Sequence, residues 1–427
     1  MQTKHSSWAF VGVFALTLLL GNVAGPVVRP VVQSIFVRLG QGNEQVVLGE
    51  GGWMYFRPAL EHLQRPLSKA PLPAISHFRE QLLLAGIELV VVPIPVKASI
   101  DDEGLGLSEN PMPPGWEAFL LDLKRYRVPI VDAYEVLSER TGPQYLMTDT
   151  HWRPEAMDAV ALAIADRLRR MGLPQRRRLV RSGKHVDGHG DLVDLLGAGV
   201  DIPSEQVTSW SVDDFPSDTL GAPVLLIGDS FANIYADASL GFGAGAGLQE
   251  AISHHLGSPV DALIQNDGGA SKTRVALQDD LGRLSDTLVV VWVFSARELS
   301  LGEWIKTPLD LDAPAQTDSP FLELAAGEQI DFTGVILDIS DVPDPRRATY
   351  ADHVVTLQVR GDDGRQGFVR GWSMRDRKLT PLASKAVGSV YRATLIPWDD
   401  AASSARSASR SELDTRPRGA PVCWGSP

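Results

Sequence analysis

The chain has 427 residues, of which 44% are hydrophobic, so it is long enough for more than one domain and can bury at least one large core. Its formal net charge of −13 argues against nucleic acid as a partner, because phosphate binding requires a basic surface. Its one cysteine, Cys423, excludes an intrachain disulfide.

The amino terminus carries a strongly apolar segment. Residues 6–28 contain no charged side chain, and Lys4 precedes the most apolar stretch, from Trp8 to Leu20. This pattern is typical of a signal peptide or a single membrane anchor. Because the small residues that follow match a cleavage site poorly, we expect residues 1–28 to remain as an inner-membrane anchor that holds the rest of the chain in the periplasm.

Between residues 80 and 300, apolar segments of strand length alternate with amphipathic segments of helix length. Strands are expected near residues 87–92, 128–131, 224–227 and 288–294. A helix is expected from Pro154 to Leu168, because proline suits a first helical turn and the apolar residues recur on one face. The pattern predicts an α/β domain over residues 40–306, with a mostly parallel sheet flanked by helices.

Two short polar segments within this domain contain the residue types of a nucleophilic triad. The first is D-T-H-W at residues 149–152, and the second is G-D-S-F at residues 228–231. A serine hydroxyl is a weak nucleophile unless a histidine removes its proton, and the histidine needs a carboxylate to fix its tautomer. Asp149 and His151 leave the same face of an extended segment, so they are the candidate acid and base for Ser230.

Each segment alone also has an ordinary structural interpretation. G-D-S is a common turn sequence, and residues 152–155 are typical of a helix start, in which Asp149 would only cap the helix and His151 would lie on the surface. The presence of both segments in one chain favours catalysis. Ser230 would follow a buried strand, at the edge of the sheet where α/β proteins bind ligands, and Asp229 is expected to be structural.

An acyl-transfer site also needs hydrogen-bond donors for the oxyanion. The backbone N–H of Ser230 is the first candidate. The second is the glycine-rich loop that contains Asn266, Gly268 and Gly269, although N-D-G-G is equally typical of an ordinary turn. Three further side chains are weaker candidates for holding a sugar or a carboxylate: Arg274, Arg297 and Tyr235.

No cofactor and no metal site is predicted. Residues 185–191 alternate histidine and aspartate with glycine, which is more typical of a loop than of a zinc site. The glycine-rich residues 241–247 lack the lysine of a phosphate-binding loop. No coenzyme A site is recognisable in the sequence.

A change in composition indicates a second domain. Residues 307–319 are rich in proline, aspartate and threonine and are expected to be a linker. Short strands are expected at residues 330–339, 354–359, 367–371 and 389–396. Their number and length predict a small β-barrel or sandwich over residues 320–400.

The aromatic residues of this second domain leave two interpretations open. Trp372, Trp398 and Tyr350 either line a saccharide or partner surface or belong to the core. Residues 401–427 begin with a stretch rich in serine, alanine and arginine and are expected to be a flexible tail.

Three further segments accompany the two polar ones: G-x-x-G-W-M-Y at residues 49–55, V-V-P-x-P-x-K at residues 91–97, and a late apolar strand that is followed by Arg297. Together the five segments resemble the AlgJ/AlgX-type alginate O-acetyltransferases, a periplasmic branch of the SGNH hydrolase-like group. In most SGNH proteins the acid and base follow the serine. Here they precede it, as in the alginate-acetylating branch.

The resemblance implies an SGNH-like fold with Ser230 as nucleophile, His151 as general base and Asp149 as the residue that orients the base. It also implies that a multispanning membrane acyltransferase supplies the acetyl group, which passes to hydroxyls of an exported polysaccharide, alginate or another. We therefore expect a membrane-anchored, periplasmic O-acetyltransferase with a serine-linked acyl-enzyme. Two alternatives remain: a carbohydrate esterase with the same triad and water as acceptor, and a non-catalytic polysaccharide-binding scaffold.

Overall fold

A computed structural model describes most of the chain. The described residues are 42–106, 111–174, 179–197, 204–216, 219–309, 311, 321–346, 348, 350–362, 364–413, 416 and 420–426. The predicted anchor, residues 1–28, and most of the predicted linker, residues 307–319, lie outside them. Within the described residues, no helix is both long and apolar enough to cross a membrane.

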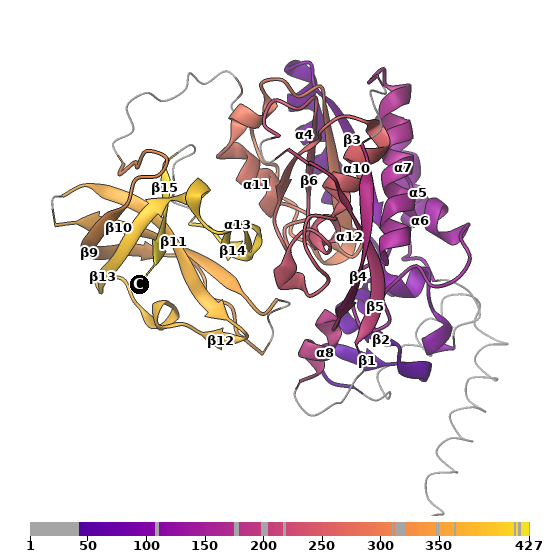
Figure 1. The fold of residues 1–427 in the computed structure, drawn as a ribbon, viewed down its shortest axis with the longest axis horizontal. Coiled ribbons are helices and arrows are strands. Elements are labelled where there is room, and N and C mark those ends of the chain that lie inside the picture. Colours follow the sequence, from indigo (N-terminus) through magenta and orange to yellow (C-terminus); the bar gives the residue numbers. More distant parts are fainter. Residues whose placement is uncertain are drawn as a thin grey trace, which may run out of the picture.

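A parallel four-stranded sheet forms the centre of the first domain (Figure 1). Its order is β3 (Glu88–Ile94), β8 (Val289–Ser295), β6 (Val224–Gly228) and β7 (Asp261–Ile264). Every residue of β6 and β8 is buried, which explains why both strands are continuous apolar runs in the sequence. The carboxyl ends of these strands therefore meet at one edge of the sheet.

Helices cover both faces of this sheet, so the domain has three layers. One core joins the sheet to α6 (Ala133–Ser138), α7 (Pro154–Arg170) and α10 (Leu248–Leu256). The other core joins it to α4 (Pro71–Leu84), α5 (Trp116–Arg125) and α11 (Lys272–Gln278). Four short helices complete the domain: α3 (Arg57–His62), α8 (Asp191–Leu196), α9 (Ser230–Asn233) and α12 (Glu298–Leu301).

One predicted strand of this domain is wrong. Residues 128–131 contribute only an isolated bridge between Ile130 and Val91. Pro129 has no N–H to donate, so a continuous ladder cannot form across this segment.

Two antiparallel strand pairs lie outside the central sheet and were not predicted. One pairs β1 (Val46–Leu48) with β2 (Met54–Phe56), and the other pairs β4 (Arg181–Gly188) with β5 (Glu205–Val212). The expectation of a loop at residues 185–188 is therefore wrong. Both pairs reach the candidate active site: the carbonyl oxygen of Met54 in β2 accepts a hydrogen bond from Lys97, and Glu205 of β5 accepts the N–H of Met147.

The carboxyl-terminal domain is a small β-barrel. Five strands close a ring in the order β11 (Gln366–Arg375), β15 (Val422–Ser426), β13 (Val390–Pro397), β9 (Ile330–Ile339) and β10 (His353–Gly361), which pairs back to β11. The four strands predicted in this domain are confirmed. Shorter elements extend it: β12 (Lys378–Leu379), α13 (Ser403–Ser407) and β14 (Ser409–Ser411).

The expectation of a flexible tail at residues 401–427 is wrong for the described part of this segment. Strand β15 pairs with β13 on one side and with β11 on the other. Cys423 and Trp424 are buried there. Without β15 the barrel would expose two unpaired strand edges, so this strand is needed to close it.

The tryptophans of the barrel domain pack mainly against its own residues. Trp372 and Trp398 both contact Trp424, with ring centroids 5.4 and 5.8 Å apart. The guanidinium of Arg370 lies over Trp398, and that of Arg375 lies over Trp372. Both tryptophans are half-buried, which favours a structural role.

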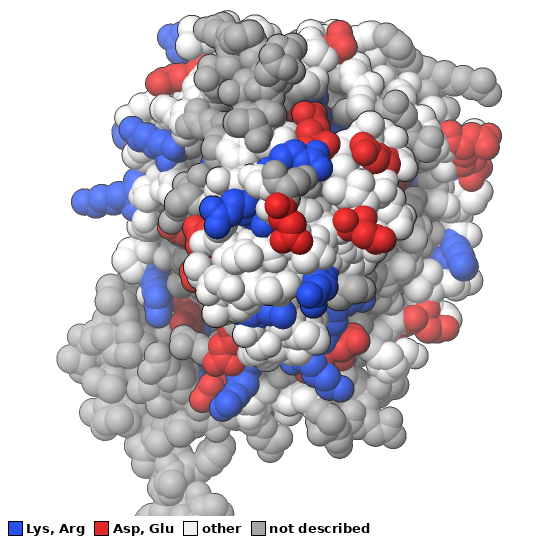
Figure 2. Space-filling view, turned by 90° about the vertical axis from the view of Figure 1, so that its left-hand side faces the viewer, with Lys and Arg blue, Asp and Glu red and all other residues white. Residues whose placement is uncertain are grey.

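The barrel domain lies beside the α/β domain and contacts it at separate points (Figure 1). The N–H of Asn266 donates to the carbonyl oxygen of Ser407 at 2.8 Å, and Arg370 of the barrel lies 3.7 Å from Asp279 after α11. On the barrel side of the molecule, positive and negative side chains are interspersed among uncharged ones (Figure 2). The described part of that face has no broad area of a single charge.

Candidate active site

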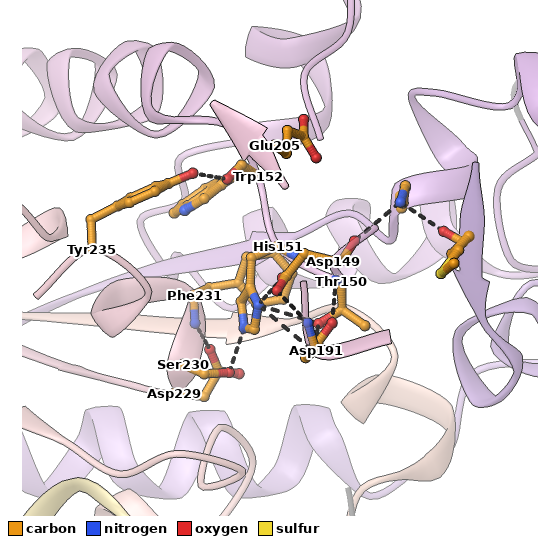
Figure 3. Close-up of polar contacts among 12 residues, drawn as sticks. Asp149, Thr150, His151, Trp152, Asp191, Glu205, Asp229, Ser230, Phe231 and Tyr235 are labelled. Carbon is orange, nitrogen blue, oxygen red and sulfur yellow. Dashed lines mark hydrogen bonds and ion pairs between the residues drawn. The ribbon is translucent and has the colours of Figure 1, made fainter. Parts of the chain in front are cut away.

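Asp149, His151 and Ser230 form a hydrogen-bonded series (Figure 3). Nδ1 of His151 lies 2.6 Å from Oδ1 of Asp149, and Nε2 of His151 lies 2.7 Å from Oγ of Ser230. A carboxylate only accepts hydrogen bonds, so Nδ1 carries the imidazole proton and Nε2 is free to accept the serine hydrogen. This is the tautomer that a general base requires.

The three side chains are buried: Asp149, His151 and Ser230 are 0, 2 and 3% exposed. Burial opposes both charges, but the mutual attraction and hydrogen bond of the pair outweigh it. The pKa of Asp149 is therefore lowered and that of His151 is raised. The histidine is thus a stronger base than a free imidazole while its partner stays ionised.

A tight turn presents Asp149 and His151. Tyr145 and Trp152 form a bridge at its base, and the N–H of Leu146 donates to the carbonyl oxygen of His151 at 3.0 Å. Oδ1 of Asp149 also accepts the N–H of His151 at 2.8 Å, so the acid shapes the turn that carries the base.

Lys97 stabilises this turn through hydrogen bonds to backbone oxygens. Its ammonium is buried and donates to the backbone oxygens of Met54, Met147 and Asp149. It also lies 5.0 Å from the ring centroid of Trp53. Burial lowers the pKa of Lys97 to about 7, although nearby carboxylates oppose the shift. The G-W-M-Y and P-x-P-x-K segments therefore both contact the turn that carries Asp149 and His151.

Asp191, the first residue of α8, supports the turn from another side. It accepts the N–H of Thr150 at 2.8 Å and the hydroxyl of Thr150 at 2.6 Å. Its own N–H donates to Oδ2 of Asp149 at 2.8 Å, and its Oδ2 lies 3.9 Å from Nδ1 of His151. Burial and the charge of Asp149 raise the pKa of Asp191 to about 6.

The role of Asp191 was missed, because the sequence places it in a different segment from Thr150. One of its oxygens, one oxygen of Asp149 and one ring nitrogen of His151 all lie within 4.8 Å of one another. The hydrogen bonds already described account for this closeness.

Ser230 begins α9 directly after strand β6. Asp229 caps this helix by accepting the N–H of Phe231 at 3.0 Å, and its other oxygen accepts the N–H of Ser295 at 2.9 Å. Asp229 thus ties the nucleophile's turn to the end of β8. Burial raises its pKa, against the effect of these hydrogen bonds.

The loop of Asn266, Gly268 and Gly269 lies beside this turn. The N–H of Gln265 donates to the carbonyl oxygen of Gly228 at 3.0 Å. A Cβ at Gly269 would lie 2.6 Å from Oδ2 of Asp229, so only glycine fits at this distance. The side-chain oxygen of Asn266 lies 3.3 Å from the amide of Asn233. The backbone N–H groups of Asn266 and Gly268 donate to the carbonyl oxygens of Ser407 and Gln265, so donation to an oxyanion by the rest of the loop stays a prediction.

Two weaker candidates lie in the core and not in a substrate site, which corrects that expectation. Tyr235 is fully buried, and its hydroxyl donates to the carbonyl oxygen of Trp152 at 2.7 Å. Arg274 is also fully buried; its guanidinium donates to the carbonyl oxygen of Ala270 and lies 4.8 Å from the ring centroid of Trp292. Both side chains stabilise the fold around the site.

Arg297 lies nearer to the site. It faces Asp267 at 3.8 Å and Glu298 at 3.4 Å, and it lines a small apolar cavity together with Phe231 and Ser295. Burial opposes its charge, but the neighbouring carboxylates outweigh burial and raise its pKa.

Tyr350 of the barrel domain reaches the nucleophile. Its hydroxyl lies 2.5 Å from Oγ of Ser230. Tyr350 also lines a cavity of about 270 Å³ between the domains, together with Asp267 and Lys272 of the α/β domain and His353 of the barrel. This contact could not be predicted from the sequence, because it depends on how the two domains dock.

The comparisons with known proteins cover the same part of the chain. Residues 46–296 match a family model described as an SGNH hydrolase-like domain, acetyltransferase AlgX. A probable alginate O-acetylase AlgJ from Pseudomonas aeruginosa is 24% identical over 309 residues, which cover 65% of this chain and 75% of the relative. Its counterpart from Pseudomonas putida is 26% identical over 293 residues, which cover 62% of this chain and 73% of the relative.

Two solved structures are similar. The O-acetyltransferase domain of Pseudomonas putida AlgJ aligns with a TM-score of 0.47 and 23% identity, over 60% of this chain and 91% of that chain. AlgX from Pseudomonas aeruginosa aligns with a TM-score of 0.49 and 14% identity, over 78% of this chain and 83% of that chain. The family model spans more than half of the chain and includes Asp149, His151 and Ser230. The chain therefore belongs to the SGNH hydrolase-like family described as acetyltransferase AlgX.

Proposed function

We propose that this protein is an O-acetyltransferase that carries an acetyl group on Ser230 and passes it to hydroxyls of an exported polysaccharide. The observation that carries the proposal is the buried hydrogen-bonded series of Asp149, His151 and Ser230 within a domain of an acetyltransferase family. The relatives named alginate O-acetylase support alginate or another exopolysaccharide as the acceptor.

In the first half-reaction, Nε2 of His151 takes the hydroxyl proton of Ser230 while Oγ attacks the carbonyl carbon of an acetyl donor. The Oγ–carbon bond forms, and the leaving group departs with the proton from His151. Asp149 stabilises the transient imidazolium through Nδ1–H. The N–H of Ser230 is the proposed first donor to the oxyanion, and the loop that contains Asn266 is the proposed second.

In the second half-reaction, His151 removes the proton of a sugar hydroxyl, whose oxygen attacks the acetyl carbonyl carbon. The bond from that carbon to Oγ breaks, and Ser230 recovers its proton from His151. The same base thus serves both steps, with no net gain or loss of protons by the enzyme.

The names of the relatives, and not the burial of Ser230, favour a sugar over water as the acceptor, because a side chain that is closed to water is closed to a sugar as well. Free access of water would hydrolyse the acetyl-serine and make the enzyme an esterase. Ser230 is 3% exposed, and the ring of Phe231 lies 4.9 Å from that of His151. We propose that the acceptor binds in the cavity between the domains that Tyr350 lines, because the hydroxyl of Tyr350 also contacts Ser230.

The resemblance and the apolar amino terminus support a proposal for the cellular setting. We propose that residues 1–28 anchor the protein to the inner membrane and that the domains lie in the periplasm. A multispanning membrane acyltransferase is the proposed source of the acetyl group.

The proposal is tested with the soluble region from about residue 30, p-nitrophenyl acetate as donor and oligosaccharides as acceptors. Release of nitrophenol is measured for the wild type and Ser230→Ala, and acetylation of the sugar is measured by mass spectrometry. Ser230-dependent acetylation of the sugar supports the proposal. Ser230-dependent release of acetate alone indicates an esterase, and equal turnover in both proteins indicates a scaffold.

A further inference from the structure

Tyr350 contacts the reacting oxygen atom from outside the domain that contains the triad. It belongs to the barrel domain, and it lies beyond residues 46–296, which match the family model. Its hydroxyl and Oγ of Ser230 are 2.5 Å apart, which is within the range of a strong O–H···O hydrogen bond. Tyr350 is half-buried in the structure.

The positions of the protons determine which oxygen donates in this hydrogen bond. The carboxylate of Asp149 fixes the imidazole proton on Nδ1 of His151, so Nε2 accepts the hydrogen of the Ser230 hydroxyl. Oγ has then used its one hydrogen and can only accept a second bond. The phenol of Tyr350 is therefore the donor.

We propose that Tyr350 is a catalytic residue that donates a hydrogen bond to Oγ of Ser230 and stabilises the negative charge that this oxygen carries in both half-reactions. Charge develops on Oγ when His151 removes its proton, and again when Oγ leaves the acetyl carbon. In both steps the proton moves between His151 and the reacting hydroxyls, and Tyr350 keeps its own. The inference rests on the proposed acyl transfer at Ser230.

The loop that carries Tyr350 is held by the hairpin of β11 and β12. The carboxylate of Asp352 accepts the N–H of Asp376 at 2.9 Å and faces Arg375 at 3.3 Å. The N–H of Arg377 donates to the carbonyl oxygen of Ala351 at 2.9 Å. Asp376 and Arg377 both have positive φ values, as a tight two-residue hairpin turn requires.

Contacts between the domains hold this loop near Ser230. The side-chain amide of Gln45 donates to the carbonyl oxygen of Ala348 at 3.3 Å, two residues before Tyr350. A second contact between the domains is the hydrogen bond from the N–H of Asn266 to the carbonyl oxygen of Ser407 in α13, at 2.8 Å. The active site is thus assembled from both domains, and the phenol is in place before the substrate arrives.

The electrostatic surroundings keep the phenol protonated. Burial raises the pKa of Tyr350, and the negative charge of Asp267 raises it further, against the effect of Arg297. A neutral phenol is the form that donates a hydrogen bond.

The test is Tyr350→Phe, which keeps the ring in the domain interface and removes only the hydroxyl. Rapid mixing with p-nitrophenyl acetate measures the rate of acylation, and decay of the acetyl-enzyme with oligosaccharide measures the second step. We expect both rates to fall about tenfold or more, because a donor to a developing charge is lost. The matched control is Tyr391→Phe, since Tyr391 is a buried tyrosine in the barrel core whose hydroxyl has no hydrogen-bond partner in the described residues.

Two results would overturn the inference. Unchanged rates in Tyr350→Phe would reduce the phenol to a contact between domains, and faster rates would show that it blocks the nucleophile. A common thermal midpoint for wild type and variant shows that any loss does not come from unfolding. If Ser230→Ala kept its activity, the proposed function itself would fail; if only Tyr350→Phe behaved as wild type, this inference alone would fail.

Discussion

The side chain of Lys97 donates a hydrogen bond to the backbone oxygen of Asp149 at 3.1 Å. The same ammonium donates to the backbone oxygens of Met54 at 2.7 Å and Met147 at 2.8 Å. One buried lysine side chain therefore fastens strand β2 to the turn that carries the acid and the base. Its effect on catalysis is through position, since it contacts the backbone of the turn and not the reacting atoms.

Replacing Lys97 should loosen this turn. Lys97→Met keeps most of the side-chain volume but removes a donor from three carbonyl oxygens; those of Met54 and Asp149 are buried, and that of Met147 keeps the N–H of Met54. Each lost hydrogen bond costs about 1 kcal/mol. We expect a lower thermal midpoint and a lower kcat with little change in KM. Lys184→Met, on the exposed part of β4, is the control and should change neither quantity. Wild-type kcat in Lys97→Met would show that the turn holds its shape without the ammonium.

The pH dependence should report the charges around His151. The base must be neutral to act, and Asp149 and Asp191 both raise its pKa above the ordinary value of 6.5. The acylation rate should therefore rise with pH and reach half of its maximum above pH 6.5.

Removing one of these charges should move the profile in a defined direction. Asp191→Asn takes away a negative charge 3.9 Å from His151, so the pKa of His151 falls and the half-maximal pH moves lower. Asp166→Asn on α7, which pairs with Arg169 at the surface, should leave the profile in place. A shift of the Asp191→Asn profile to higher pH would contradict the electrostatic account.

Gly190 allows the segment before α8 to pack against the turn. A Cβ at this position would lie 2.0 Å from the carbonyl oxygen of Thr148, so Gly190→Ala must push the two segments apart. We expect a loss of acylation of about tenfold or more, because a small displacement of the base is costly. At Gly282, a Cβ meets no atom within 4 Å, and Gly282→Ala serves as the control. Equal rates for the two variants would show that the turn does not depend on this packing.

Arg274 should affect stability and not chemistry. Its guanidinium is enclosed by aromatic rings and donates to the carbonyl oxygen of Ala270. Arg274→Met should lower the free energy of unfolding by about 2 kcal/mol or more, through the unpaired carbonyl and lost packing. The rate of acylation per folded molecule, measured below the unfolding transition, should match the wild type. A large fall in that rate would return Arg274 to the list of substrate-binding candidates.

The sequence predicted the structure best where a local pattern alone determines an element. The apolar runs at residues 224–227 and 288–294 predicted buried parallel strands, and the alternating segments after residue 330 predicted the strands of the barrel. The two polar segments also predicted which side chains meet. A nucleophilic triad requires a serine, a histidine and a carboxylate, and these segments supply all three.

Other features depend on long-range packing, which a single sequence does not reveal. Arg274 is charged, yet it lies in the core because backbone oxygens and aromatic rings surround it. Strand β15 is short and follows a polar segment, and only closure of the barrel makes it a strand. Tyr350 reaches Ser230 because of domain docking, which no local pattern encodes.

The most direct measurement is the mass of the intact protein after mixing with an acetyl donor, followed by peptide mapping and then by addition of an acceptor oligosaccharide. Acetyl transfer through Ser230 predicts one acetyl group on that residue, no acetyl group on Ser230→Ala, and transfer of the group from the wild-type protein to the sugar. An acetyl group elsewhere, or acetylation of the sugar by Ser230→Ala at the wild-type rate, would contradict it.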